Sequence, residues 1–169
     1  DLVISSLSVP GMERVVTHLA LLDLPQLILA PRSLEDVLRD IREVATRLQV
    51  TAQGEALVQS LTDQKESLIA QRSSRRVPIY LEWWPKPMFT PGNSCFSNEL
   101  IDLAGGINVF ANRPGSSVEI SPQELIDAAP QICFLSWCGA PLAKLNPDQL
   151  RSRRGLEGLN RSAKERVIP

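Results

Sequence analysis

One long stretch of mostly polar sequence, from Ala52 to about Arg72, predicts a single helix in the middle of the chain. Its few apolar positions recur at roughly helical spacing, and the rest is rich in Gln, Lys and Glu. A helix of about 20 residues spans ~30 Å, which is the width of a small lobe. Because its apolar face is weak, this helix fits a strut between two lobes better than a core helix.

The sequence before this helix predicts part of an α/β lobe. Short apolar runs at Leu2–Ile4 and Leu27–Leu29 are typical of buried strands, and residues 12–22 between them have helical periodicity. Strand, helix and strand in this order form one crossover unit of a parallel sheet. A further helix follows, capped by Ser33 and carrying an apolar stripe as far as Leu48.

The sequence after the long helix returns to the same alternation. The expected strands and extended pieces are residues 77–81, 109–110, 118–120, 132–137 and 166–168. A helix over about residues 95–104 is expected to end at Gly105–Gly106, and another helix to begin at Asn146. Serine, proline and glutamate within Ser121–Glu124 predict a helix start with a capping box.

These patterns predict an α/β fold with two Rossmann-like lobes, each built on a parallel sheet and joined by one long helix. The expected divisions are residues 1–50 for the first lobe, 51–75 for the linking helix and 76–169 for the second lobe. The chain opens and closes abruptly beside predicted strands, so we expect a fold truncated at both ends.

Composition argues against two kinds of partner. The 169 residues carry a formal net charge of −1, with acidic and basic residues interspersed, which argues against nucleic acid or an anionic membrane surface as a partner. No apolar run approaches the ~20 residues of a membrane-spanning helix. The hydrophobic fraction of 43% is ample for a core.

Residues that usually carry catalysis or bind metals are sparse. The single histidine, His18, lies beside the apolar stripe of its helix and is expected to be solvated, with metal or cobalt ligation as the minor alternative. The three cysteines have no metal-binding spacing, and Cys133 is expected to be a buried apolar residue. No serine lies in a nucleophile-elbow sequence, and no glycine-rich phosphate loop is present. The sequence therefore predicts no catalytic residues, no metal site and no cofactor.

The segment from Leu81 to Gly92 is the strongest candidate for a ligand site. Two adjacent tryptophans, Trp83 and Trp84, follow a strand, and three prolines and a glycine then predict a stiff, irregular loop. The third tryptophan, Trp137, lies at the end of another predicted strand. Because ligands bind outside the carboxyl ends of parallel strands, we expect both segments to face one site. The alternative for each tryptophan is packing beneath its own loop.

Three charged residues near these segments have two interpretations each. Glu82 and Lys86 flank the tryptophans, and are either hydrogen-bonding groups for a ligand or solvated charges. Glu124 is either part of the capping box or a residue that contacts a partner.

The segments Leu81–Gly92, Asn98–Gly106 and Ser136–Gly139 resemble the cobalamin-binding branch of the periplasmic substrate-binding proteins. The opening residues, Asp1–Ser5, resemble a strand late in the first lobe of that class, and the resemblance covers essentially the whole chain. It implies the class III fold, in which one long helix joins two α/β lobes. It further implies that a corrinoid, cobalamin-like, binds in the cleft between the lobes and is delivered to the permease of an ATP-driven (ABC) importer.

The same resemblance implies residue roles and a cellular location. The implied ligand-binding residues are Ser6, Leu7 and Val9 in the first lobe, and Trp83, Trp84, Pro85, Met88, Phe89 and Trp137 in the second. The glutamate through which family members dock on the transporter aligns with Gln123, and Glu124 is its neighbour. The protein would be a monomer, located in the periplasm or held at the cell surface of a bacterium as a lipoprotein. Contact with the membrane would come only through the transporter or a lipid anchor outside this chain.

Two alternatives stay open at this stage. The same fold could bind haem or a ferric siderophore, although Tyr80 is expected within a strand, His18 lies away from the strand ends, and only Arg32 is placed for an anionic siderophore. The fold could also belong to an enzyme or to an intracellular corrinoid-handling protein.

Overall fold

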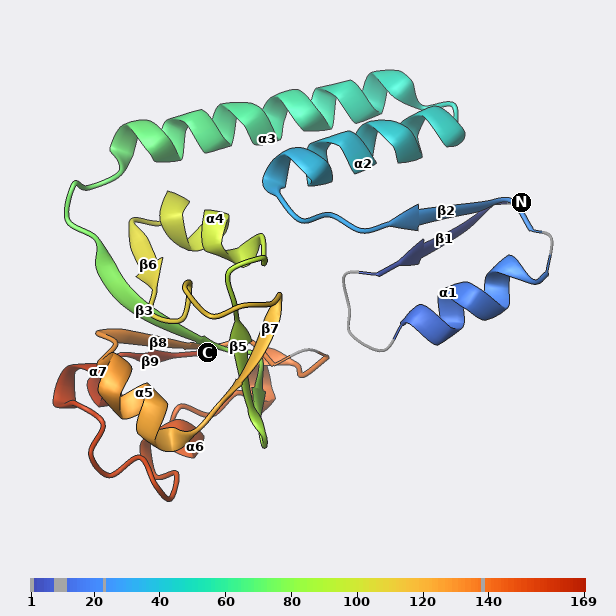
Figure 1. Ribbon diagram of the computed structural model, residues 1–169. Coiled ribbons are helices and arrows are strands. Elements are labelled where there is room, and N and C mark those ends of the chain that lie inside the picture. Colours follow the sequence, from blue (N-terminus) through green and yellow to red (C-terminus); the bar gives the residue numbers. More distant parts are fainter. Residues whose placement is uncertain (1, 8–11, 23, 138) are drawn as a thin grey trace. The chain divides into compact units, whose positions relative to one another are not determined.

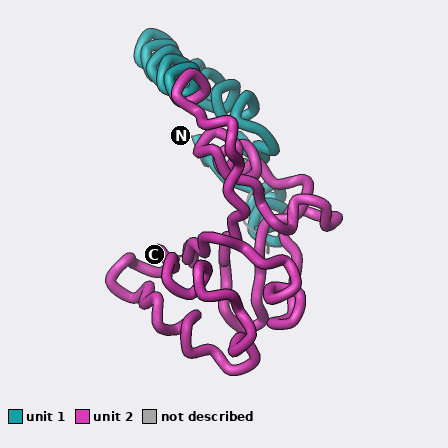
Figure 2. Tube along the Cα trace, turned by 90° about the vertical axis from the view of Figure 1, so that its left-hand side faces the viewer, with its two compact units in different colours: residues 1–67 teal, residues 68–169 magenta. Residues whose placement is uncertain are grey.

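The computed structural model describes residues 2–7, 12–22, 24–137 and 139–169. It divides into two compact units, residues 1–67 and 68–169 (Figure 2). The boundary falls inside α3 (Thr51–Gln71), the long helix that the polar stretch predicted.

Unit 1 contains a two-stranded parallel sheet, as its strand–helix–strand pattern predicted (Figure 1). Its elements are β1 (Val3–Ser6), α1 (Glu13–Ala20), β2 (Gln26–Leu29), α2 (Leu34–Arg47) and the first part of α3. Ser33 caps α2 as expected: its hydroxyl accepts a hydrogen bond from the Asp36 backbone N–H at 3.0 Å. The Asp36 carboxylate accepts one from the Ser33 backbone N–H at 3.1 Å, which completes a capping box.

Helices α2 and α3 approach each other closely at Gly54. A Cβ atom at this position would lie 2.3 Å from the Cβ of Ala45, so the helices can only pack in this way around a glycine. Ala45 and Gly54 are both buried. The close approach shows that unit 1 has its own packed interior even though most of α3 is polar.

Unit 2 contains a four-stranded parallel sheet in the order β6-β3-β8-β9 and a three-stranded antiparallel sheet in the order β4-β5-β7. The strands are β3 (Val77–Glu82), β4 (Trp84–Pro85), β5 (Met88–Pro91), β6 (Gly106–Asn108), β7 (Ser117–Ile120), β8 (Ile132–Leu135) and β9 (Val167–Ile168). The helices are α4 (Ser97–Leu103), α5 (Pro122–Ala128), the 3-10 helix η1 (Leu142–Lys144), α6 (Asp148–Arg151) and α7 (Arg161–Glu165).

The core of unit 2 lies around β3 and β8. These strands are neighbours in the parallel sheet, with Glu82 opposite Leu135, so their carboxyl ends lie side by side. Tyr80 and Cys133 in these strands are fully buried. Cys133 is thus the buried apolar residue that was predicted, and burial, together with the charge of Glu82, raises the pKa of its thiol to about 12.

Two expectations about extended structure were wrong. The segment after the tryptophans is a hairpin, β4–β5, rather than an irregular loop. It tolerates its prolines because Pro85 lies in the two-residue edge strand β4, and Pro91 is the last residue of β5. The strand expected at residues 109–110 instead forms at Gly106–Asn108, directly after Gly105, whose φ of +79° ends α4.

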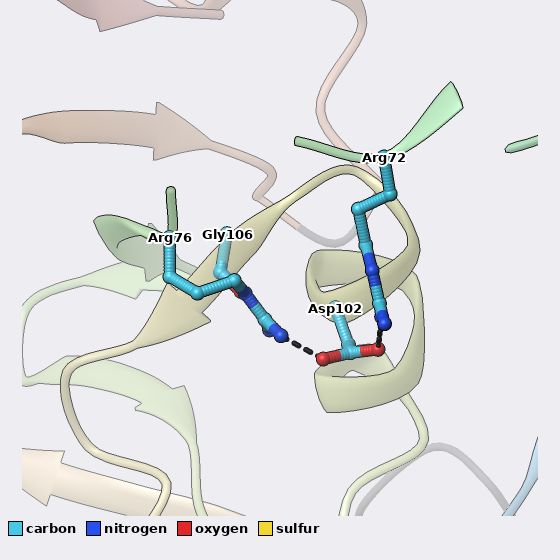
Figure 3. A network of polar contacts seen from close by, with 4 residues as sticks. All are labelled: Arg72, Arg76, Asp102 and Gly106. Atoms are coloured by element: carbon cyan, nitrogen blue, oxygen red, sulfur yellow. Dashed lines mark hydrogen bonds and ion pairs between the residues drawn. The ribbon is translucent and has the colours of Figure 1, made fainter. Parts of the chain in front are cut away.

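The end of α3 and the start of β3 are joined to α4 by a group of charged side chains. Asp102 in α4 lies between Arg72 and Arg76 and forms an ion pair with each (Figure 3). Arg76 also donates from Nε to the carbonyl oxygen of Gly106 at 3.0 Å. These contacts fix the chain between α3 and β3 against α4 and β6.

Across the parts of the chain that the structure describes, no helix is both long enough and apolar enough to cross a membrane.

Candidate ligand-binding site

The β4–β5 hairpin presents aromatic side chains at the carboxyl end of β3. The Trp83 backbone N–H donates to the carbonyl oxygen of Phe89 at 2.8 Å, and Trp84 lies opposite Phe89 in the antiparallel ladder. The Trp84 side chain is 47% exposed, and its indole N–H donates to the carbonyl oxygen of Lys86 at 3.0 Å. Local hydrogen bonding therefore holds a large flat side chain in contact with solvent.

The other implied wall residues of the hairpin differ in burial. Trp83, Pro85 and Phe89 are partly buried. Met88 is 5% exposed and belongs to the hydrophobic core of unit 2. Alternation along β5 separates Met88 from Phe89, because neighbouring side chains on a strand point to opposite faces. A ligand could reach Trp83, Trp84, Pro85 and Phe89 more readily than Met88.

Glu82, the last residue of β3, is fully buried and forms the centre of a polar cluster, which we call the Glu82 cluster. Arg153 donates to Glu82 Oε1 from Nη2 at 2.8 Å and to Oε2 from Nη1 at 2.5 Å. The Trp137 indole N–H donates to Oε1 at 3.0 Å, and the Tyr80 hydroxyl donates to Oε2 at 3.0 Å. Glu82 thus bonds protein groups and is neither a solvated charge nor free to bond a ligand.

The electrostatics of the cluster follow from burial and charge. Burial alone would lower the pKa of Arg153, but the hydrogen bonds and charge of Glu82 outweigh it and raise this pKa. Burial, and then the charge of Glu82, raise the pKa of Tyr80 well above its usual value. Arg153 therefore stays ionised and Tyr80 stays neutral over the physiological pH range.

Trp137 follows β8 and is brought to the Trp83–Trp84 segment by this cluster. The Ser136 backbone N–H donates to the carbonyl oxygen of Glu82 at 2.8 Å, which continues the β3–β8 pairing up to Trp137. A pocket of about 500 Å³ is lined by Trp137 together with Pro85 and Lys86 of the hairpin. Trp137 and the hairpin residues Pro85 and Lys86 therefore share a pocket, whereas Trp83 and Trp84 do not line it.

The candidate residues of unit 1 lie at the end of β1. Ser6 is the last residue of this strand and is partly buried. Leu7 is 38% exposed, and its backbone N–H donates to the carbonyl oxygen of Leu29 at 2.8 Å. Val9 lies outside the described residues.

The two residues implied in docking begin helix α5 and differ in how firmly they are held. Glu124 closes the predicted capping box, because its Oε2 accepts from the Ser121 backbone N–H at 2.8 Å. Its Oε1 forms an ion pair with Arg113. The Ser121 backbone N–H, the Arg113 side chain and the Ser121 hydroxyl lower the pKa of Glu124 to about 2. Gln123 is exposed, and its side-chain N–H donates to Asp127 at 2.8 Å.

Sequence reasoning missed Arg153 altogether, and it lies 71 residues from its partner Glu82. The one available signal was Glu82, directly before the tryptophans, because a buried carboxylate needs a basic partner. Among the described residues, no group of three or more His, Cys, Asp or Glu side chains could hold a metal ion.

An aromatic wall at the carboxyl edge of a parallel α/β sheet is typical of proteins that bind small organic ligands. The sequence profile of the periplasmic binding protein family matches residues 1–168, and the chain belongs to this family. The chain is 21% identical over 135 residues to a vitamin B12-binding protein of Pectobacterium carotovorum subsp. carotovorum, covering 76% of this chain and 47% of that protein.

Two solved structures share the fold. The haem-binding protein RhuT of Roseiflexus sp. RS-1 has a TM-score of 0.79 and 23% identity, over 99% of this chain and 65% of its own. The vitamin B12-binding protein BtuF of Vibrio cholerae has a TM-score of 0.72 and 15% identity, over 99% of this chain and 64% of its own. The chain therefore spans about half the length of the curated relative and about two thirds of these structures.

Proposed function

We propose that this chain is part of the solute-binding component of an ABC importer and that its ligand is a corrinoid of the cobalamin type. The observation that carries the proposal is that the segments bearing the three tryptophans follow the neighbouring strands β3 and β8 at their carboxyl ends, where Trp137, Pro85 and Lys86 line one pocket. Flat indole faces suit a large, rigid, partly apolar macrocycle. Similarity to vitamin B12-binding proteins supports the same ligand.

The proposed wall of unit 2 consists of the accessible aromatic and proline side chains. These are Trp83, Trp84, Pro85, Phe89 and Trp137, with Met88 supporting them from the core. Ser6, Leu7 and Val9 are the proposed contribution of unit 1. The protein would act as a monomer without catalysing a reaction, in the periplasm or at the bacterial cell surface.

Haem is a weaker candidate because neither the single tyrosine nor the single histidine of the chain is placed to bind its iron. The Tyr80 hydroxyl is fully buried and donates to Glu82, so it is not available to iron. His18, in α1, is exposed and lies in unit 1, away from the carboxyl ends of β1 and β2.

The test is a titration of the full chain with cyanocobalamin, followed by quenching of tryptophan fluorescence. We expect saturable quenching at micromolar ligand. Trp84→Ala should weaken binding by about tenfold or more, because an exposed aromatic anchor is removed. Leu100→Ala is the matched control, since Leu100 on α4 is an apolar residue that is exposed to the same extent as Trp84. Absence of quenching in the parent protein would contradict the corrinoid assignment.

We also propose that the exposed start of α5 contacts the permease through Gln123, with Glu124 holding the helix end in place. Glu124 is already engaged by Ser121 and Arg113, whereas Gln123 makes only a local bond on the surface. Gln123→Lys should reduce stimulation of the importer's ATPase by about tenfold. Asn112→Lys places the same charge on another exposed position and should leave the stimulation of the ATPase unchanged. Equal effects of both variants would contradict docking at α5.

A further inference from the structure

The pocket beside Trp137 has walls that differ from the aromatic surface next to it. It measures about 500 Å³ and lies between the β4–β5 hairpin, the end of β8 and the segment around α6. Its lining residues are Pro85, Lys86, Trp137, Gln149, Ser152, Arg153 and Arg154. Three of these are basic and none is acidic.

The acidic residues nearest to this pocket are already bonded to protein groups. Glu82 lies beneath it, fully buried, and accepts both hydrogen bonds from Arg153. Asp148 at the start of α6 is ion-paired with Arg151. Glu157 interacts electrostatically with Arg154, but its carboxylate accepts from the Gly155 backbone N–H. A ligand group in the pocket would therefore face basic side chains, while the nearby carboxylates are bonded to protein groups.

The basic groups differ in how they are held. Glu82 cancels the charge of Arg153 and fixes its guanidinium, yet a guanidinium has N–H donors beyond the two that Glu82 occupies. Lys86 and Arg154 are exposed, and within the described part of the chain neither forms an ion pair. The excess positive charge of the pocket thus comes from Lys86 and Arg154, arranged around a rigid arginine.

We propose that this pocket binds an anionic oxygen group, a phosphodiester or a carboxylate, on the periphery of a large planar ligand whose ring stacks on Trp137. Arginine and lysine donors around a water-accessible hollow are the usual partners of such groups. The inference rests on the proposed function, since it assigns one substituent of the proposed corrinoid, its phosphodiester, to a defined part of the same site. It also supplies a role for Glu82, which positions both Trp137 and Arg153.

The experiment compares two corrinoids of which only one carries this group. Cyanocobalamin has a phosphodiester in its nucleotide loop, and dicyanocobinamide lacks the whole loop, so the variants below separate the phosphodiester from the ribose and the base. We expect the full chain to bind cyanocobalamin about fivefold to tenfold more tightly. In the double variant Lys86→Gln/Arg154→Gln, this preference should fall to about twofold or less, with affinity for dicyanocobinamide unchanged. Lys144→Gln, an exposed lysine on η1 outside the pocket, should retain the parent preference.

Equal losses for both corrinoids, or an unchanged preference, would overturn the inference while leaving corrinoid binding intact. If the parent protein binds neither corrinoid, the proposed function fails and the pocket is tested with haemin, whose anionic groups are carboxylates, and with pyrophosphate alone. Pyrophosphate should then shift the Trp137 indole N–H resonance saturably at millimolar concentration, with the signal assigned by Trp137→Phe. The double variant should abolish this shift and weaken haemin binding. No shift in the parent protein would overturn the inference on its own.

Discussion

Glu82 and Asp102, two of the carboxylates in unit 2 that pair with arginine, differ mainly in burial. Glu82 and Arg153 are 0% and 9% exposed in their side chains. Asp102 is 44% exposed, and its partners Arg72 and Arg76 are 31% and 35% exposed. Water screens the Asp102 group, whereas Glu82 depends on its protein partners for all of its solvation.

The difference in burial gives Glu82 and Asp102 different structural roles. Loss of one partner from the Glu82 cluster leaves a buried charge uncompensated, so the cluster fixes Trp137 and Arg153 in one arrangement. The Asp102 group lies at the surface between α3 and α4 (Figure 3), where water can replace any contact that is lost. The Glu82 cluster is expected to set the geometry of the ligand site. The Asp102 group is expected to stabilise the position of the chain between α3 and β3.

Glu82→Gln should have the largest effect. We expect it to lower the free energy of unfolding by about 3–5 kcal/mol, because Arg153 would be left buried without a counter-charge. Urea unfolding of the full chain, followed by circular dichroism, measures this. Glu119→Gln on the exposed face of β7 is the control and should change stability by less than about 0.5 kcal/mol. A loss below about 1 kcal/mol for Glu82→Gln would remove the distinction between the two carboxylates.

Arg153→Lys should cost about 1–3 kcal/mol. The charge is retained, but an ammonium cannot reproduce the paired hydrogen bonds to both oxygens of Glu82. Chemical unfolding again provides the measurement, with Arg161→Lys at an exposed i,i+4 pair on α7 as the matched control. A cost equal to that of the control would show that charge alone, without geometry, holds the cluster.

Asp102→Asn should cost about 1 kcal/mol or less at low ionic strength. Because the group is partly exposed, its contribution should shrink further in ~1 M salt, where the Debye length is about 3 Å. The same salt should leave the cost of Glu82→Gln nearly unchanged. Unfolding free energies at two salt concentrations measure both effects. A large loss of unfolding free energy for Asp102→Asn that does not depend on salt would contradict the distinction between the exposed Asp102 and the buried Glu82.

Glu124 offers an exposed third case in which hydrogen bonding rather than burial controls the carboxylate. Its folded pKa of about 2 lies below the ordinary value of 4.5, so it stabilises the fold above pH 4.5, and this contribution is lost as the pH falls towards 2. Arg113→Gln should raise this pKa to an intermediate value, because the Ser121 donors remain. An NMR titration of the Glu124 carboxyl carbon measures it. An unchanged pKa would assign the whole shift to the helix cap.

Local features of the fold were predictable because their causes are local. The predicted serine cap at Ser33 and the predicted capping box at Ser121 need only residues a few positions apart, and the structure contains both. The long helix was predicted within one residue of its ends, since polarity and length decide it. The placement of Trp83 and Trp137 after neighbouring strands also followed from sequence, through the rule that parallel strands end at the same edge.

Features that depend on pairing between distant segments were missed. The β4–β5 hairpin is stabilised by pairing of β5 with β7, about 30 residues further along the chain, and no local signal outweighed its prolines. The same pairing decides which side of β5 faces the core and therefore buries Met88. Trp84 could be placed at the surface only once this register was known.

The α/β alternation, the long helix, the helix caps and the position of the aromatic segments at strand ends could all be predicted from local patterns. Each of these depends on periodicity, on capping chemistry or on direction within a parallel sheet. The burial of Glu82, its pairing with Arg153 and the basic residues beside Trp137 became visible only in the folded chain. Whether a charge is solvated or paired depends on which side chains surround it in space, and residues 71 positions apart leave no periodic trace of that contact.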